Sequence, residues 1–265
     1  MERGETALFC ARIEEFDTLA ERGEFCFTRY LTPREQMQAR SVRGRVRRFV
    51  WGGYPDAERR RIFFVPDYVG EVDGEGELDV LETLVAYFPE ELSAALTRLH
   101  IAGSGFRSLT HRDYLGSVLA LGIERDVLGD IVVLDDYSAV LFCDDKIAAY
   151  LLTALERIGN DKVKVNFASD DISLPPRATR PISDTIASPR LDCVVAALIN
   201  LSREKAKMMI RAGEVELNFA PEQRTDAEVR EGDMLSLRGH GRFRICSIGT
   251  LTKRGRLRLS AAQYI

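Results

Sequence analysis

Hydrophobic positions recur with helical spacing most clearly between residues 188 and 245. A first helix is predicted by apolar residues at i, i+3, i+4 and i+7, which are Leu191, Val194, Val195 and Leu198. Ser202 is a typical N-cap and predicts the start of a second helix. Gly213 follows that helix where a left-handed C′ residue is favoured, so the pattern predicts two consecutive helices that end there.

The second helix separates its apolar and cationic residues. Its core-facing positions are Ala206, Met209 and Ile210. Arg203, Lys207 and Arg211 recur every four residues and therefore form one cationic ridge on another face, with Lys205 beside it. A run of charges on a helix is usually a solvated face, but this one also suits the phosphates of a nucleic acid.

Short strands and a glycine-rich loop follow the helices. Val215 and Leu217 alternate with polar residues as in a strand, and the turn at residues 231–233 leads into a second strand at residues 234–238. The loop that follows places Arg238, His240 and Arg242 around two glycines. Such a loop suits phosphate binding.

The first 187 residues predict two further domains. Residues 1 to about 48 are predicted to be helical, followed by short strands on either side of a Gly/Pro turn at residues 52–59. Trp51 and Tyr54 near this turn are expected to pack in the core, with base stacking as the alternative. The Gly-rich acidic stretch at residues 70–77 predicts a domain boundary.

The stretch after this boundary alternates strands and helices. After a helical lead-in near residues 78–96, the pattern predicts a strand at 97–102, a helix at 111–121, strands near 130–134 and 139–143, a helix at 144–158 and a strand at 162–167. Split βαβ units in this order give a ferredoxin-like α/β plait, an antiparallel sheet with helices on one face. Because no RNP-type aromatic signature is present, RNA binding by this sheet does not follow from a motif.

Residues 168–188 are rich in Pro, Ser and Thr and are predicted to be a linker, whereas residues 253–256 predict a hairpin turn between two further strands. The fold class is therefore α+β. We predict an N-terminal helical and β domain at residues 1–72, the plait at 73–168, and a small RNA-binding module at 183–265.

Charge is distributed unevenly along the chain. The whole sequence has 37 Lys and Arg against 41 Asp and Glu. Residues 188–265 hold 14 Lys and Arg against 9 Asp and Glu, a net charge of +5, which leaves 23 against 32, or −9, for residues 1–187. The predicted electrostatic footprint for a nucleic acid is therefore at the C-terminal end.

Composition argues against several other classes of protein. The five cysteines are scattered without a C-x-x-C pair, which predicts reduced, mostly buried thiols with neither disulfides nor a zinc site. His100, His111 and His240 lack ligand spacing, so we expect no metal and no cofactor. No apolar run reaches the length of a membrane span, and the charged first residues do not form a secretion signal, so we expect a cytoplasmic protein.

The C-terminal pattern resembles the S-four RNA-binding module, which is named after a small-subunit ribosomal protein. The matching residues are Arg190-Leu191-Asp192, Ser202 to Ala206, Ile210, Gly213, Val215, Asn218, Gly232-Asp233 and Arg238 to Phe243. Phe219 departs from the pattern, because many such modules have Gly after the Asn. We therefore expect a different local turn, with a loop that carries its own contact.

Three other stretches resemble the YlmH family: residues 30–36, residues 52–59, and residues 109–116 with 121–123 and 129–131. With the C-terminal module the resemblance covers nearly the whole chain. It implies a cytosolic protein from a cell-division gene neighbourhood of Gram-positive bacteria. It further implies a role in ribosome-associated quality control on the large ribosomal subunit, in contact with ribosomal RNA and peptidyl-tRNA.

Catalytic motifs fail on their context, and we expect no enzymatic activity. His111-Arg112-Asp113 echoes a kinase catalytic loop, but the downstream Asn, a Gly-rich phosphate loop and a D-F-G motif are absent. Thr110 and Asp113 instead predict a capping box. Arg190-Leu191-Asp192 is similar to the active-site tripeptide of pseudouridine synthases, but no catalytic domain follows it. A synthetase is opposed by the chain length and by the lack of a nucleotide-binding signature.

Two hypotheses follow. The first is a non-enzymatic RNA-binding protein of translation, with ribosomal RNA, tRNA and the large subunit as partners. Its predicted RNA contacts are Arg190, Arg203, Lys205, Lys207, Arg211, Arg238, His240 and Arg242. The second is a cytosolic adaptor that docks a protein partner, such as a division protein, through residues 1–180 and uses the RNA module as an auxiliary.

Overall fold

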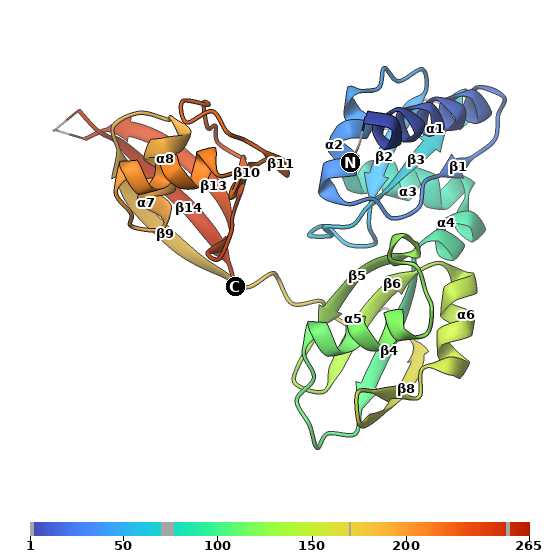
Figure 1. Cartoon of the computed structure of the whole chain (residues 1–265). Coiled ribbons are helices and arrows are strands. Elements are labelled where there is room, and N and C mark those ends of the chain that lie inside the picture. Colours follow the sequence, from blue (N-terminus) through green and yellow to red (C-terminus); the bar gives the residue numbers. More distant parts are fainter. Residues whose placement is uncertain (1–2, 70–76, 170, 253–254) are drawn as a thin grey trace. The chain divides into compact units, whose positions relative to one another are not determined.

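The computed structural model describes residues 3–69, 77–169, 171–252 and 255–265 (Figure 1). The chain forms two compact units, residues 1–175 and residues 176–265, and each is described by itself. Helices and antiparallel sheets occur in both units, which confirms the predicted α+β class. The predicted boundary at residues 70–77 lies almost wholly outside the described residues.

The first lobe of unit 1 has a three-stranded antiparallel sheet of strand order β1-β3-β2. Its elements are α1 (Arg3–Glu21), β1 (Cys26–Phe27), α2 (Pro33–Ser41), β2 (Arg47–Trp51), β3 (Arg61–Val65), the short 3-10 helix η1 (Asp67–Val69), α3 (Glu77–Tyr87) and α4 (Pro89–Ala95). The prediction of helix throughout residues 1–48 is therefore wrong at β1 and at the start of β2. All residues of β3 are buried, because apolar side chains pack against both faces of the sheet.

Two local contacts explain the start of this lobe. The side chain of Thr32 caps α2 and Glu35 reaches back to the backbone N–H of Thr32, which completes a capping box. Strand β2 is held by Arg48, whose guanidinium donates to the carboxylate of the fully buried Asp17 of α1 at 2.5 and 3.1 Å. Arg48, one of five arginines between residues 40 and 48, is therefore an anchor inside the protein. Trp51 is buried in the core, as expected, so the base-stacking alternative fails for it.

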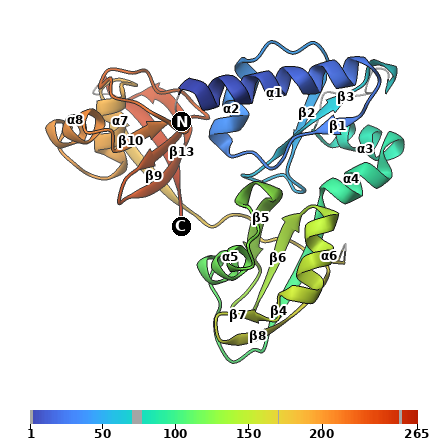
Figure 2. The ribbon, with the colours of Figure 1, turned by 45° about the vertical axis from the view of Figure 1, so that its right-hand side comes forward.

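The second lobe of unit 1 has a five-stranded antiparallel sheet of order β5-β6-β4-β8-β7. Its elements are β4 (Thr97–Gly103), α5 (His111–Ala120), the 3-10 helix η2 (Arg125–Val127), β5 (Leu128–Val133), β6 (Ser138–Cys143), α6 (Asp145–Ala154), β7 (Arg157–Ile158) and β8 (Asp161–Phe167). Each predicted strand and helix of this stretch is found, but the last predicted helix ends at Ala154 because β7 begins three residues later. In Figure 2, α5 and α6 lie beside this sheet.

The two lobes of unit 1 meet at a polar junction centred on Asp130 of β5. Its buried carboxylate accepts hydrogen bonds from the hydroxyl of Tyr54 (2.9 Å) and from the backbone N–H groups of Glu58 (2.7 Å) and Arg59 (3.1 Å). The guanidinium of Arg59 donates in turn to the carbonyls of Leu128, Tyr30 and Arg125. The residues that carried the family resemblance at 52–59 and 129–131 therefore meet in a structural joint.

A buried cation completes the junction. Arg61 of β3 is 2% exposed, forms an ion pair with Asp144 at the N-cap of α6, and lies 4.2 Å from the ring centroid of Tyr30. Burial raises the pKa of Asp144, which the charge of Arg61 opposes. Tyr54 stacks on Phe142 with ring centroids 5.2 Å apart, which confirms its predicted packing role.

Unit 2 has a six-stranded antiparallel sheet of order β11-β10-β12-β13-β14-β9, with two helices on one face. Its elements are β9 (Thr179–Ile186), α7 (Leu191–Leu198), α8 (Arg203–Arg211), β10 (Val215–Leu217), β11 (Ala220–Pro221), β12 (Met234–Leu237), β13 (Gly241–Leu251) and β14 (Leu257–Tyr264). The predicted linker at residues 168–188 is wrong from Thr179 onward, because β9 pairs with β14 along its full length. Residues 253–254 of the predicted hairpin turn lie outside the described residues.

Candidate nucleic-acid interface

The helix pair of unit 2 is built as the sequence predicts. All residues of α7 except Ala197 are buried, and Ser202 caps α8 by accepting a hydrogen bond from the backbone N–H of Lys205. Gly213 ends the region with a φ of +74°, in the left-handed conformation. These contacts fix α8 on the core and turn its charged side outward.

A buried carboxylate orients two of the predicted RNA contacts. The fully buried Asp192 accepts hydrogen bonds from Arg203 (2.6 Å) and from Arg190 (3.2 Å). Burial opposes ionisation of Asp192, but these hydrogen bonds outweigh it and hold the pKa of Asp192 below its usual range. The side chains of Arg190 and Arg203 remain 43% and 51% exposed, so both present N–H groups to solvent while their positions are fixed.

The predicted ridge lies on α8. Arg203, Lys207 and Arg211 follow one another along about 12 Å of the helix, and Lys207 also forms an ion pair with Glu204 at 2.7 Å. Lys205 is exposed, but two residues correspond to about 200° of rotation, so it lies on another side of α8. The ridge therefore consists of three cations, and Lys205 is separate from it.

The glycine-rich loop is a tight turn between β12 and β13. Leu237 pairs with Gly241, which leaves Arg238, Gly239 and His240 in the turn. Gly239 and Gly241 have φ values of +78° and +92°, in the region that favours glycine. Arg238 and His240 are exposed at this tip.

Arg242 belongs to a cationic surface that the sequence analysis missed. Phe243 and Ile245 of β13 are buried in the core beneath the helices, so the alternating Arg242 and Arg244 point to the other face of the sheet. By the same alternation around the buried Leu259, Arg258 of β14 lies on this face too. We call Arg242, Arg244 and Arg258 the sheet arginines. The alternation of apolar and basic residues in these strands is the signal that could have identified them.

The predicted contacts therefore do not form one patch. The ridge lies on the helix side of unit 2, the sheet arginines lie on the helix-free side, and Arg238 with His240 lies at the turn that connects β12 to β13. Glu216 of β10 shares the helix-free face, because it pairs with Ser236, which pairs with Arg242. Two separate cationic surfaces are thus available on one small unit.

The sheet of the second lobe of unit 1 is covered over part of its helix-free face. Val140 and Phe142 of β6 are buried there beneath Tyr30 of the first lobe, and Ile172 and Leu174 pack against the same cluster. The rest of this face, over β4 and β8, carries a polar strip, His100, Lys164 and Asn166. A single-stranded RNA could stack over β6 only after this cover is displaced.

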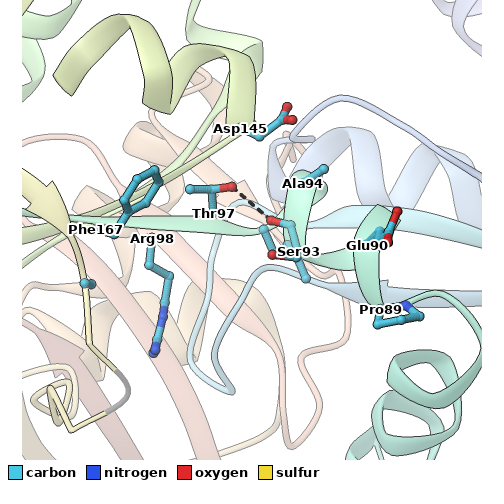
Figure 3. A pocket seen from close by; sticks show the side chains of 10 residues that line it. Pro89, Glu90, Ser93, Ala94, Thr97, Arg98, Asp145 and Phe167 are labelled. Atoms are coloured by element: carbon cyan, nitrogen blue, oxygen red, sulfur yellow. Dashed lines mark hydrogen bonds between the residues drawn. The ribbon is translucent and has the colours of Figure 1, made fainter. Parts of the chain in front are cut away.

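An open pocket of about 640 Å³ lies where α4 of the first lobe meets the second lobe (Figure 3). It is lined by residues from α4, β4, the start of α6 and the end of β8, among them Arg98, Asp145 and Phe167. Phe167 is 64% exposed. Aromatic residues and arginine are enriched at protein-binding surfaces.

The other candidate chemistry has structural explanations. Thr110 and Asp113 form the predicted capping box of α5, with the carboxylate of Asp113 accepting from the backbone N–H of Thr110 at 2.9 Å. The five cysteines are free thiols; two are buried, two are partly buried and Cys246 is exposed, so fewer are buried than expected. In the part of the chain that the structure describes, no cluster of acidic, Cys and His side chains has the arrangement of a metal site. The same part contains no helix suited to crossing a membrane.

Comparisons with known proteins complete the description. Residues 7–69 match a family model described as "YlmH, N-terminal", and residues 89–171 match "Putative RNA-binding domain in YlmH". The "Ribosome-associated protein quality control protein P2" of Bacillus subtilis (strain 168) is 28% identical over 261 residues, which cover 97% of this chain and 95% of that protein. The solved structure of "Cell division protein ylmH from Streptococcus pneumoniae" covers 64% of this chain and 95% of its own, with 17% identity and a TM-score of 0.47.

The structure and these matches define an α+β protein with a middle domain of a type described as RNA-binding. The chain belongs to the YlmH family, as its motifs predicted. The module predicted at residues 183–265 lies outside both matched ranges, so its assignment and its RNA contacts stay predictions.

Proposed function

We propose that this protein is a non-enzymatic RNA-binding protein that acts on the large ribosomal subunit, in contact with ribosomal RNA and a tRNA. The observation that supports this most strongly is the pair of cationic surfaces on unit 2, in a chain whose first 187 residues have a net charge of −9. The relative named for ribosome-associated quality control and the matched RNA-binding domain support the same role.

We further propose that the second lobe of unit 1 is a ferredoxin-like plait and that unit 2 is an S-four-type module. The order β4-α5-β5-β6-α6-β8 is that of a ferredoxin-like plait, and the helix pair α7–α8 on a small antiparallel sheet is that of an S-four-type module. In the plait, Tyr30 of the first lobe covers β6 and blocks RNA there. We therefore propose that RNA contacts the open polar strip formed by His100, Lys164 and Asn166.

The opposite placement of the two cationic surfaces supports contact with two RNA segments. One RNA helix cannot bind both sides of a folded sheet with helices packed on it. A ribosomal RNA segment beside a tRNA offers two phosphate surfaces at once. We assign the ridge to the ribosomal RNA, and either Arg190, which shares Asp192 with Arg203, or the stretch from Arg238 to Arg242 to the tRNA.

Charge reversal on each surface tests this proposal. Lys207→Glu with Arg211→Glu alters the ridge, and Arg244→Glu with Arg258→Glu alters the sheet arginines. Arg22→Glu, at the exposed turn that follows α1, is the control outside unit 2. If about five phosphates are neutralised, log K for a labelled ribosomal RNA fragment falls with log salt at a slope of about −4 to −5. Each double variant is expected to weaken binding and to flatten this slope, whereas the Arg22 variant leaves both unchanged.

Crosslinking in cells, followed by sequencing of the bound RNA, tests the location. We expect reads from large-subunit ribosomal RNA and from tRNA, and the two double variants are expected to lose different reads. Reads concentrated on messenger RNA or on the small subunit contradict the proposed location. An affinity that does not depend on salt contradicts electrostatic binding altogether.

An adaptor that docks a protein through unit 1 is the second candidate. It is favoured by the acidic balance of residues 1–187 and by the open pocket beside the exposed Phe167. After nuclease treatment, residues 1–175 alone should then still co-purify with the partner. Co-purification only through residues 176–265 contradicts the adaptor.

A further inference from the structure

The turn between β10 and β11 has a conformation that its sequence does not favour. Leu217 pairs with Ala220, so Asn218 and Phe219 alone form the turn, with φ values of +51° and +64°. A two-residue hairpin with positive φ at both positions is a type I′ turn, for which Asn-Gly is the preferred pair. An aromatic residue in the left-handed region is strained, because its Cβ approaches the backbone.

The contacts of Asn218 explain its own conformation. Its side-chain amide donates to Asp233 at 2.8 Å and accepts from the backbone N–H of Met234 at 2.9 Å. These two hydrogen bonds of the Asn218 side chain hold the turn against the start of β12. They place Phe219 at the tip but do not require an aromatic residue there.

The backbone strain at Phe219 is not offset by packing of its ring in the core of unit 2. Among the described residues of unit 2, the buried core and the partly buried side chains that pack against it do not include Phe219, whose exposure is intermediate. The ring instead lies against the guanidinium of Arg242, whose Cζ is 5.6 Å from the ring centroid. A strained residue without a packing role is often retained for a function.

The location of this pair suits RNA. Arg242 lies on the helix-free face of the sheet beside Arg244, so the ring borders a cationic surface. Proteins that bind single-stranded nucleic acid combine such cations, which contact the phosphates, with aromatic rings on which bases stack.

We propose that Phe219 and Arg242 form a stacking platform for an unpaired nucleobase of the bound RNA. This inference rests on the proposed RNA-binding function and adds to it a specificity for single-stranded nucleotides. Arg242 supports the ring and contributes its charge, while Phe219 supplies the π face.

The test compares two probes on the full chain. One is a fluorescein-labelled RNA hairpin whose two strands are joined by a non-nucleotide linker and which carries a single-stranded adenosine extension. The other is the same hairpin with a blunt end, which has no unpaired base. Phe219→Gly restores the preferred Asn-Gly turn, so it should raise the melting temperature of the protein. We expect the same variant to lose roughly 5- to 150-fold in affinity for the extended hairpin, the range that one stacked base supplies.

The controls separate stacking from other effects. Binding of the blunt hairpin should be unchanged in Phe219→Gly, Phe219→Tyr should retain affinity for the extended hairpin, and Phe219→Leu should lose it. Equal losses on both hairpins, or no loss on either, overturns the platform. If the unmodified protein binds neither hairpin, the proposed function itself fails, and the platform fails with it.

Discussion

Replacing Asp130 by alanine should destabilise unit 1 more than any exposed substitution does, because one carboxylate joins its two lobes. Asp130 is 8% exposed and accepts three hydrogen bonds, from Tyr54, Glu58 and Arg59. A hydrogen bond to a charged group contributes about 1.5 to 3 kcal/mol. The three donors are only partly buried and can regain water, so we expect a loss of about 3 to 4 kcal/mol, below the simple total.

Two milder variants show how much of this loss in stability comes from individual hydrogen bonds of Asp130. Tyr54→Phe removes one donor and should cost about 1 to 1.5 kcal/mol. Asp130→Asn keeps one acceptor oxygen but turns an amide N–H₂ toward a backbone donor, so an intermediate loss of about 2 kcal/mol is expected. Glu82→Ala on the exposed side of α3 is the control, with a change within about 0.5 kcal/mol.

The fluorescence of Trp51 provides the assay. Trp51 is the single tryptophan of the chain and is 4% exposed in the first lobe, so urea unfolding followed by its emission reports on unit 1 without a signal from unit 2. If Asp130→Ala lowers the free energy of unfolding by less than about 1 kcal/mol, or by no more than Tyr54→Phe does, Asp130 does not join the two lobes as argued.

Two other predictions concern packing and pH. A Cβ at Gly129 would lie 2.7 Å from a ring carbon of Tyr30 and 2.8 Å from Phe142, so Gly129→Ala should cost about 1 to 3 kcal/mol in the same urea assay, whereas Gly116→Ala in α5, with nothing within 4 Å, should be neutral or stabilising. Because the pKa of Asp192 is held below its ordinary value of about 4, its stabilisation of unit 2 is present above that pH and is lost as the pH falls through the lowered pKa. Melting temperatures of Asp192→Asn should therefore fall less with acid than those of the unmodified protein.

Helices whose ends carry several local sequence signals are predictable from the sequence alone. Helix α5 has its capping box at Thr110 and Asp113, and α8 has both a capping serine and Gly213 after its end. Such signals act within a few residues, so they are visible without a structure. The ridge was predictable for the same reason, because it depends only on the spacing of cations along one helix.

Elements that depend on distant partners were missed. Strand β2 begins in an arginine run, and Arg48 fits there only because Asp17, 31 residues earlier, is buried beneath it. Strand β9 is an edge strand with Pro181 and mostly exposed side chains, so its polarity matches that of a linker. Only its pairing with β14 distinguishes it, and pairing is a non-local property.

The residues that identify the family and those proposed to bind RNA serve different purposes. The motif at residues 52–59 and Asp130 form the junction of unit 1, where buried polar contacts demand particular residues at each position. Cationic surfaces impose a weaker demand, since a phosphate accepts any lysine or arginine in reach. These two stretches of the family resemblance therefore report on the joint that holds the lobes together. The strained Phe219 beside Arg242 is where the proposed RNA specificity should be sought.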